Sequence, residues 1–360
     1  MSNLGTISIG VKMPLIKQGD DIAKIVTDNL PLTGINYEDK DIIGITESIV
    51  ARAEGNYVSV QDIADDITEK FGKNQIISVV WPIYSRNRFS MILKGIARAA
   101  KEVRLLLKYG KDEVGNDILN PFTNINIIDF YREVIESENC EAVIIQTNFK
   151  NDAYYTQETN NIIIATIHSR FDLKQEFSSK RNKIFTLDEI CSTVTDKHGY
   201  NEEYGLLGSN KATDDTLKLF PRKKTCEDII YRIQDIIKEQ SGKSVEVLIY
   251  GDGCFKDPVG GIWEFADPVV SPAYTKGLDG TPNELKLKYI IDNENKSSDE
   301  IKQMISDKDN DLKGNMLSQG TTPRRYTDLI GSLCDLTSGS GDKGTPVVWI
   351  KNYFKNYSSN

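Results

Sequence analysis

The stretch Asp41-Ile42-Ile43-Gly44-Ile45-Thr46-Glu47-Ser48-Ile49-Val50-Ala51-Arg52-Ala53-Glu54-Gly55 carries the clearest fold signal in the chain. Its first part is an apolar, β-branched run, which predicts a buried strand over 41–46. The strand is expected to run into a short helix that ends near Gly55. The start of such a helix presents backbone N–H groups to an anion, and Arg52 follows one turn later.

Strand and helix patterns alternate along the rest of the chain. The predicted strands cover residues 6–12, 76–80, 103–108, 142–147, 162–167, 245–249 and 346–350. The predicted helices cover residues 19–29, 60–71, 91–100, 127–137, 225–241 and 326–336, with some helix near 299–305. Thr225 and Asp228 have the spacing of a capping box, and Gly242 is a natural stop. The alternation predicts an α+β fold of mixed sheets with flanking helices.

Charge and hydropathy exclude several classes of protein. The 360 residues carry a formal net charge of −9, which argues against a nucleic-acid-binding surface. No apolar run is long enough to span a bilayer, which argues against a membrane protein. Residues 1–5 lack the basic and apolar regions of a signal peptide, so we expect a soluble, cytoplasmic protein.

Cysteine and histidine are too sparse to suggest a familiar site. The cysteines, five in number and scattered, are Cys140, Cys191, Cys226, Cys254 and Cys334. Their odd number and spacing argue against a disulfide framework or a zinc site. The histidines are His168 and His198, and we expect surface or core positions for both, so chemistry that rests on histidine has little support.

A glycine-rich acidic segment follows the predicted strand over 245–249. It reads Tyr250-Gly251-Asp252-Gly253-Cys254-Phe255-Lys256-Asp257-Pro258, and the carboxylates in and after it are Asp252, Asp257, Glu264 and Asp267. Glycines allow a sharp turn and a close ligand approach, and carboxylate oxygens suit Mg²⁺ or Mn²⁺ with phosphate completing the shell. The alternative is a polar loop in which Asp and Gly only form turns.

Two further segments could hold anions. Thr337-Ser338-Gly339-Ser340-Gly341-Asp342-Lys343-Gly344-Thr345-Pro346 joins a helix to a strand, and its amides could cradle phosphate beside Lys343. It lacks the Gly-Lys-Ser/Thr ending of a P-loop, and a flexible connector is the alternative. Arg86 and Arg88, followed by Lys94 and Arg98, could grip carboxylate or phosphate, or could form a solvated helix start.

The N-terminal segments resemble the coenzyme F-420 gamma-glutamyl ligase family. The matching residues are Pro14-Leu15-Ile16, Gly19-Asp20-Asp21 and the segment 49–55, and softer matches lie at Ser209-Asn210, 247–253 and 338–348. The resemblance spans most of the chain as one ligase-like domain over 1–350. That domain would carry an insertion at about 85–200, a charged excursion at about 292–320 and a tail over 351–360. A weakly marked boundary falls near Tyr200.

The resemblance implies a ligase that uses GTP or ATP with Mg or Mn and joins an amino acid such as L-glutamate to an acid through an acyl phosphate. The implied nucleotide-binding residues are Met13, Pro14, Leu15, Ile16, Arg52, Asn210, Gly339, Ser340, Gly341, Asp342, Lys343 and Gly344. Asp252 and Asp257 would hold the metal, with Glu264 and Asp267 as further ligands. Arg86 and Arg88 are our own candidates for the acidic co-substrate. The resemblance also implies two intertwined subdomains and a homodimer.

The sequence departs from the family pattern at three places. Arg52 stands where the family has a nucleotide-contacting lysine, Leu207 stands where it has a metal-binding aspartate, and Gly251-Asp252 replaces Asp-Thr. These departures favour, as alternatives, a ligase on the same scaffold that joins an amine or ammonia to a different acid, or a non-catalytic nucleotide-binding protein.

Overall fold

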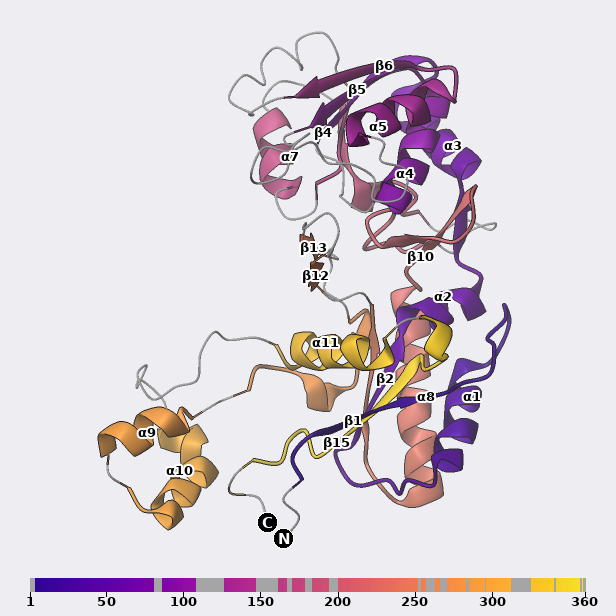
Figure 1. Cartoon of the computed structure of the whole chain (residues 1–360). Coiled ribbons are helices and arrows are strands. Elements are labelled where there is room, and N and C mark those ends of the chain that lie inside the picture. The colour runs from indigo at the N-terminus through magenta and orange to yellow at the C-terminus, as the bar shows by residue number, and fades with distance from the viewer. Residues whose placement is uncertain are drawn as a thin grey trace. The chain divides into compact units, whose positions relative to one another are not determined.

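The chain has a mixed α+β fold that divides into two units (Figure 1). The first unit contains residues 1–49, 224–253 and 270–360, and the second contains residues 50–223 and 254–269. The computed structural model describes residues 4–80, 86–107, 126–146, 161–166, 170–178, 183–193, 200–251, 254–256, 263–265, 271–282, 285–294, 296–311, 325–339, 341–356 and 358.

A five-stranded sheet forms the centre of the first unit, in the order β1-β15-β2-β11-β14. The strands are β1 (Ile7–Val11), β2 (Ile42–Thr46), β11 (Glu246–Tyr250), β14 (Ala273–Tyr274) and β15 (Val347–Lys351). β2 and β11 are parallel, and the other neighbours are antiparallel. All five residues of β15 and the first four of β2 are buried, which explains why both read as continuous apolar runs.

Helix α11 (Tyr326–Ser338) packs against one face of this sheet. Ile330 and Cys334 of α11 belong to a fully buried cluster with strand residues Ile42, Leu248 and Val348. Helices α1 (Ile22–Asn29) and α8 (Lys223–Ser241) lie beside each other in Figure 1. The short α2 (Glu47–Glu54) begins in the first unit, directly after β2, and continues into the second.

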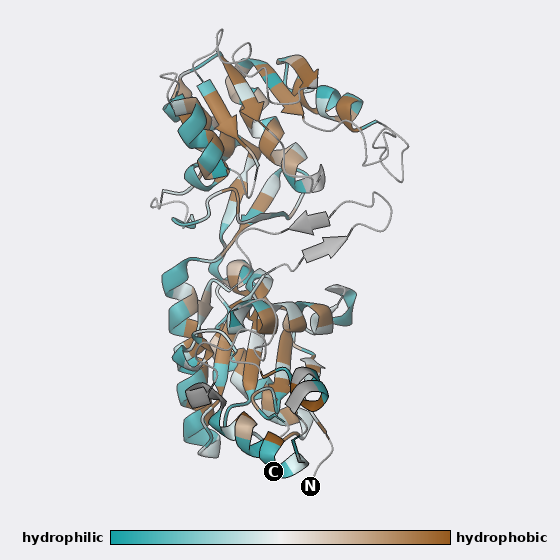
Figure 2. Cartoon of the chain, turned by 90° about the vertical axis from the view of Figure 1, so that its left-hand side faces the viewer, coloured by the Kyte–Doolittle hydropathy of each residue, from teal (hydrophilic) through white to brown (hydrophobic). Residues whose placement is uncertain are grey.

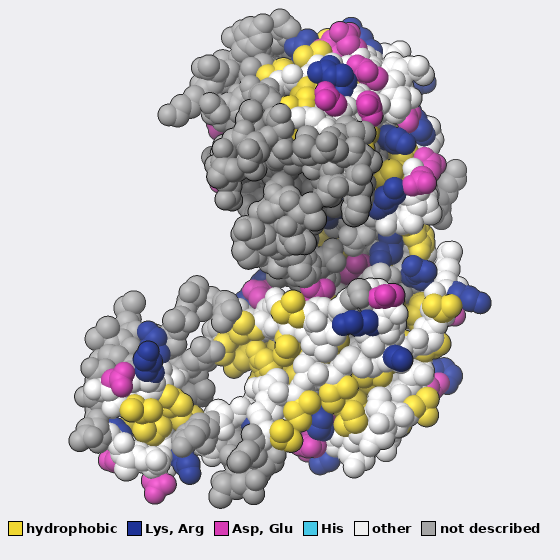
Figure 3. Space-filling model, in the orientation of Figure 1, with side chains coloured by type: hydrophobic (Ala, Val, Ile, Leu, Met, Phe, Trp, Pro, Cys, Tyr) yellow, Lys and Arg dark blue, Asp and Glu magenta, His cyan; other side chains and the backbone are white. Residues whose placement is uncertain are grey.

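The charged segment that follows β14 forms two helices with a core of their own. They are α9 (Leu287–Glu294) and α10 (Ser298–Asp311), and the predicted helix near 299–305 is therefore longer than expected. Ile290, Ile301 and Ile305 are buried together there. Figure 3 shows hydrophobic side chains gathered on this pair of helices, with charged side chains around them.

A parallel five-stranded sheet dominates the second unit, in the order β6-β5-β4-β7-β8. Its strands are β4 (Gln75–Val80), β5 (Ala100–Leu107), β6 (Glu141–Gln146), β7 (Asn161–Ile164) and β8 (Lys183–Thr186), and every neighbouring pair is parallel. The helices that the structure describes in this region are α3 (Val60–Phe71), α4 (Arg86–Ala99), α5 (Ile127–Glu136) and α7 (Arg170–Ser178). In Figure 2 the strands of this sheet are largely brown (hydrophobic), whereas the helices beside them carry teal (hydrophilic) residues, as expected when helices cover a buried sheet.

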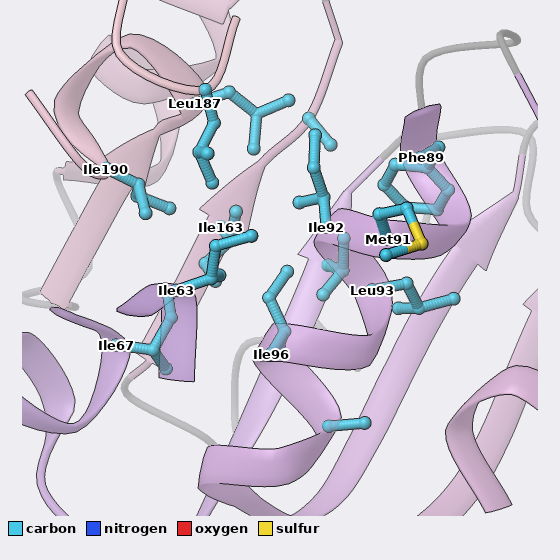
Figure 4. Close-up of a cluster of buried hydrophobic side chains, with 14 of the residues drawn as sticks. Ile63, Ile67, Phe89, Met91, Ile92, Leu93, Ile96, Ile163, Leu187 and Ile190 are labelled. Atoms are coloured by element: carbon cyan, nitrogen blue, oxygen red, sulfur yellow. The ribbon is translucent and has the colours of Figure 1, made fainter. Parts of the chain in front are cut away.

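The largest core of the second unit joins α3, α4 and α5 to one face of the parallel sheet (Figure 4). Gly95 allows α4 to approach α3 closely, because a Cβ at that position would lie 2.4 Å from Ile63 Cγ2. Ile63, Ile92 and Ile96 are fully buried there. The close helix contact therefore depends on the absence of a side chain at Gly95.

Small antiparallel sheets complete the second unit. β10 (Thr216–Leu219) lies between β3 (Tyr57–Ser59) and β9 (Ser209–Lys211). β12 (Cys254–Lys256) pairs with β13 (Trp263–Phe265). These short strands were not predicted, because three or four residues are too few to display a period.

Most predicted elements are confirmed, and the errors lie at their ends. The structure confirms the strand over 41–46 and the helix over 60–71. The helix predicted from 225 starts at Lys223, so Thr225 and Asp228 lie inside it and the capping box was wrong. The helix predicted from 91 starts earlier, at Arg86. The residues before Met91 have no apolar period, so the sequence pattern did not indicate that they belong to the helix.

Other ends also shifted. The helix predicted from 19 starts at Ile22. The strands predicted over 245–249 and 346–350 are each shifted by one residue, and they correspond to β11 and β15. Gly242 does end α8, with φ of 71° and its N–H bonded to the Lys238 carbonyl. Among the described helices, none combines the length and apolar character that crossing a bilayer requires.

Candidate functional site

Several strands of the first unit begin or end at the same end of the sheet. Val11, the last residue of β1, pairs with Val347, the first residue of β15. Val347 in turn pairs with Ile45 of β2, and Thr46 pairs with Tyr250 at the end of β11. The segments after β1, β2 and β11 and the segment before β15 therefore all leave the sheet at one end.

Two of the predicted nucleotide-binding segments contact each other at this end. The Met13 N–H donates to the Gly344 carbonyl at 3.1 Å, which joins the segment 13–16 to the segment 339–344. The Thr46 N–H donates to the Pro346 carbonyl at 2.9 Å and joins the end of β2 to the same loop. Segments that are far apart in sequence thus form one backbone surface.

The segment after Met13 is held by a single buried side chain. Ile16 is 7% exposed, whereas Leu15 beside it is 91% exposed. Pro14 is exposed as well, and Met13 is partly buried. The segment is therefore anchored at Ile16, and its apolar side chains at 14 and 15 are free to lie against a ligand.

The loop between α11 and β15 is anchored at both ends by hydroxyl groups. Thr337 Oγ1 lies 2.7 Å from Ser8 Oγ, and Thr345 Oγ1 donates to the Ser338 carbonyl at 2.9 Å. Gly10 faces this anchor, since a Cβ there would lie 3.2 Å from the Thr345 Cβ. The ends of the loop are thus fixed on β1 and α11.

The middle of the same loop is exposed and carries a lysine over a glycine. Gly341, Asp342, Lys343 and Gly344 are exposed, and Ser340 lies outside the described residues. Gly339 has φ of 62°, and a Cβ there would lie 2.6 Å from Lys343 Nζ. Exposed loop amides next to an ammonium group suit a phosphate ligand.

The Gly19-Asp20-Asp21 motif has a structural role. Asp20 Oδ2 accepts from the Lys17 N–H at 2.6 Å, which closes the turn before α1. Asp21 caps α1 through the Lys24 N–H at 3.1 Å and pairs with Arg232 at 2.8 Å. The hydrogen bond from Arg232, with help from the Lys24 N–H, lowers the pKa of the Asp21 carboxyl below its usual value.

At the end of β2, the chain turns directly into α2. Glu47, the first residue of α2, is 1% exposed, and the Ser48 N–H donates to Thr46 Oγ1 at 3.4 Å. Arg52 is exposed in the last turn of α2, in the part of this helix that belongs to the second unit.

The predicted metal ligands are largely outside the described residues. Asp252, Asp257 and Asp267 lie there entirely, and Glu264 belongs to β13 without a described side chain. β11, the strand before them, ends at the buried Tyr250 on the sheet end described above. In the described ranges no group of three or more His, Cys, Asp or Glu residues could hold a metal ion, and the metal site stays a prediction.

Arg88, one of the predicted anion-binding residues, connects distant parts of the second unit. It is 8% exposed, and its Nη1 donates to the carbonyls of Leu207 at 3.2 Å and Ser209 at 2.9 Å. No sequence signal joins these residues, because 119 and 121 positions separate them. Arg86 is the first residue of α4, and its side chain is not among those described.

Two other positions singled out by the sequence lie in the second unit. Leu207 is fully buried in the hydrophobic core, so this side chain has a packing role. Asn210 is half-buried in β9. His168 and His198 fall outside the described residues, and the free cysteines that are described, Cys140, Cys191, Cys226 and Cys334, are buried.

Comparisons with known proteins point in one direction. The sequence profile of the family described as F420-0:Gamma-glutamyl ligase matches residues 10–352. The chain is also 44% identical over 77 residues to Coenzyme F420:L-glutamate ligase from Methanothermobacter thermautotrophicus, a match that covers 20% of this chain and 31% of the relative. The chain therefore spans less than a third of the length of that relative.

Proposed function

We propose a function for this chain from one premise: the chain belongs to the F420-0:gamma-glutamyl ligase family, whose profile covers residues 10–352. From it we infer that the protein is a ligase that forms an amide between an amino acid such as L-glutamate and an acidic acceptor, at the expense of GTP or ATP. The relative from Methanothermobacter, named as an L-glutamate ligase, supports the amino-acid substrate.

The proposed reaction has two steps. An acceptor carboxylate attacks the γ-phosphorus of the nucleotide, which forms an acyl phosphate and releases the nucleoside diphosphate. The amino group then attacks the acyl carbon, loses a proton to solvent and expels phosphate. Transfer of a phosphoryl group asks mainly for positioning and charge neutralisation, so no strong protein nucleophile is needed.

The contact between Met13 and Gly344 carries the nucleotide assignment. It brings the segment 13–16, in which Pro14 and Leu15 are exposed, beside the exposed residues Gly339 and 341–344 of the loop, with Lys343 available to an anionic phosphate. We propose that Met13, Pro14, Leu15 and Ile16 border the nucleotide, and that Gly339, Ser340, Gly341, Asp342, Lys343 and Gly344 bind its phosphates. The family resemblance adds Arg52 and Asn210 as further candidates for nucleotide binding. Arg86 and Arg88 are our own candidates for binding the acidic acceptor.

A divalent cation fits the donor chemistry of the chain. Asp252 and Asp257 follow β11, which leaves the sheet at the same end as the nucleotide loops, and carboxylate oxygens are the donors that Mg²⁺ and Mn²⁺ prefer. We propose these two residues as ligands, with Glu264 and Asp267 as further donors. Such an ion would neutralise phosphate charge.

A coupled assay tests this proposal. The purified chain is incubated with GTP or ATP, Mg²⁺ or Mn²⁺, L-glutamate and a panel of carboxylic acids, and nucleoside diphosphate release is measured. We expect release that requires both the acid and the amine, and its loss in Asp252→Asn. Asp235→Asn, on the exposed side of α8, is the matched control. Full activity of Asp252→Asn would refute the metal assignment.

A second candidate rests on Leu207. Because this fully buried side chain cannot coordinate a metal, the acceptor could differ from that of the named relative, or catalysis could be lost altogether. Nucleotide titration with and without Mg²⁺ separates these cases. Binding that ignores the metal, with no turnover on any acid and amine or ammonia, would favour a non-catalytic nucleotide-binding protein.

We also propose a homodimer, in line with the family resemblance. Light scattering behind size-exclusion chromatography measures the mass directly, to be compared with the 40.5 kDa of one chain.

A further inference from the structure

A tyrosine is buried at the end of the first unit's sheet from which the proposed nucleotide loops leave. Tyr250 is the last residue of β11, pairs with Thr46 of β2 and is 1% exposed. Its ring packs in the layer between the sheet and α11, where a Cβ at Gly44 would lie 3.4 Å from its Cδ1. Cys334 of α11 belongs to the same buried cluster. The Tyr250 side chain therefore faces the last two turns of α11.

Ser338 is the α11 residue that lies next to the Tyr250 hydroxyl. It is the last residue of the helix and shares a helix face with Cys334, four positions earlier. Burial raises the pKa of the Tyr250 hydroxyl well above its usual value, and the neighbouring Ser338 side chain opposes part of that rise. The Ser338 carbonyl accepts from Thr345 Oγ1 at 2.9 Å, so Ser338 also forms the root of the loop before β15.

The Tyr250 hydroxyl is nevertheless buried without a well-formed hydrogen bond to any residue that the structure describes. A buried hydroxyl that lacks a partner destabilises the state in which it occurs, so such a group calls for a partner in another state of the protein. Ser338 Oγ can accept this bond. Its own O–H is donated to the Asp335 carbonyl at 2.9 Å, and a hydroxyl oxygen has two lone pairs.

We propose that Tyr250 is a positioning residue for the nucleotide: its hydroxyl donates to Ser338 Oγ when Gly339 and residues 341–344 bind the phosphates, and the bond holds the root of the loop in place. The inference rests on the proposed function in taking this loop as the phosphate-binding loop. Because the bond belongs to the bound state, it strengthens nucleotide binding without stabilising the free protein. A tyrosine with a purely structural role would stabilise the free protein and leave binding unchanged.

Calorimetric titration and thermal unfolding of the full-length protein together test this assignment. The probes are the non-hydrolysable β,γ-imido analogues of GTP and ATP, in the presence of Mg²⁺. We expect Tyr250→Phe to weaken binding about three- to tenfold, as loss of one hydrogen bond would, and to keep or raise the Tm of the free protein. Ser338→Ala should weaken binding as well, and the double variant should bind no more weakly than the weaker single variant.

Tyr37→Phe is the matched control. The Tyr37 hydroxyl is also buried without a well-formed hydrogen bond among the described residues, and its ring stacks on Trp349 at a centroid distance of 4.6 Å. Trp349 pairs with Ile43 near the start of β2, whereas Tyr250 pairs with the last residue of that strand. The same loss of a hydroxyl there should leave analogue binding as in wild type.

Four outcomes would overturn the positioning role and leave the ligase proposal intact. They are equal binding by Tyr250→Phe and wild type, a lower Tm of free Tyr250→Phe, strictly additive losses in the double variant, and equal weakening by Tyr37→Phe. A different result separates the two proposals. If wild type binds neither analogue, or if Lys343→Ala binds as tightly as wild type, the proposed nucleotide loop is wrong, and the role of Tyr250 is refuted with it.

Discussion

Gly44 of β2 lies directly against Cys334 of α11. A Cβ at Gly44 would be 2.3 Å from the Cys334 Sγ and 3.3 Å from its Cβ. Both residues belong to the buried layer between α11 and the sheet, where α11 leads into the loop 339–344. The glycine therefore determines how closely α11 approaches β2.

Substitution of Gly44 should be costly because the space is already filled. We expect Gly44→Ala to reduce the free energy of unfolding by about 1–3 kcal/mol through overpacking. Adding Cys334→Ala removes the closest atom and should recover a large part of that loss in a double-mutant cycle. Gly5→Ala, with nothing within 4 Å of the new Cβ, is the control. Chemical denaturation measures the four proteins of the cycle and the control, and strictly additive effects would contradict the contact.

A buried ion pair at the other end of β2 makes a second prediction. Asp41 is 2% exposed and accepts from Trp349 Nε1 at 2.9 Å and Lys351 Nζ at 3.0 Å. Asp41→Ala should cost about 3–5 kcal/mol, since it leaves the Lys351 ammonium without its buried acceptor. Lys355→Ala removes an exposed pair with Glu38 and should cost less than about 1 kcal/mol. Similar losses in both variants, measured by urea unfolding, would contradict the distinction.

The glycine under Lys343 makes a third prediction. Gly339→Ala should destabilise the protein because the backbone φ at this position is positive, and the new Cβ should also displace the Lys343 side chain. Gly280 has a φ of 92°, and a Cβ there would have nothing within 4 Å. Gly280→Ala therefore tests the effect of backbone strain alone. We expect Gly339→Ala and Lys343→Ala to weaken the binding of a GTP analogue about tenfold, as loss of one charge-assisted hydrogen bond would. Gly280→Ala should bind normally. Calorimetric titration that finds all three alike would remove Lys343 from the nucleotide site.

The lowered pKa of Asp21 gives a pH dependence. Because the folded-state pKa lies below the unfolded value of about 3.9, the ion pair with Arg232 stabilises the fold above that pH. The contribution is lost as pH falls through the folded-state pKa. Asp21→Asn retains a capping side chain and should be less stable at pH 7 by under about 1 kcal/mol, since the pair is exposed. Thermal unfolding from pH 7 to pH 2 should show the difference vanish; a constant difference would contradict this origin.

Prediction from the sequence succeeded where the signal was local. The apolar run 42–45 and the spacing of Ile63, Ile67 and Phe71 predicted β2 and α3 because burial imposes a period on neighbouring residues. The start of α4 at Arg86 and the strands β3, β9 and β10 were missed, since their residues carry no such period. Arg88 was singled out for its charge, but its bonds to Leu207 and Ser209 come from a chain segment more than a hundred residues away.

The amino-acid sequence alone determined which segments are apolar enough to be buried and which turns need glycine, because burial and backbone freedom act on each residue where it stands. Only the tertiary structure decided which strands became neighbours, and hence that Met13 meets Gly344, that Asp41 meets Lys351 across 310 positions, and that β7 returns to lie beside β4. Those pairings follow from how whole surfaces pack together, a property that no single segment contains.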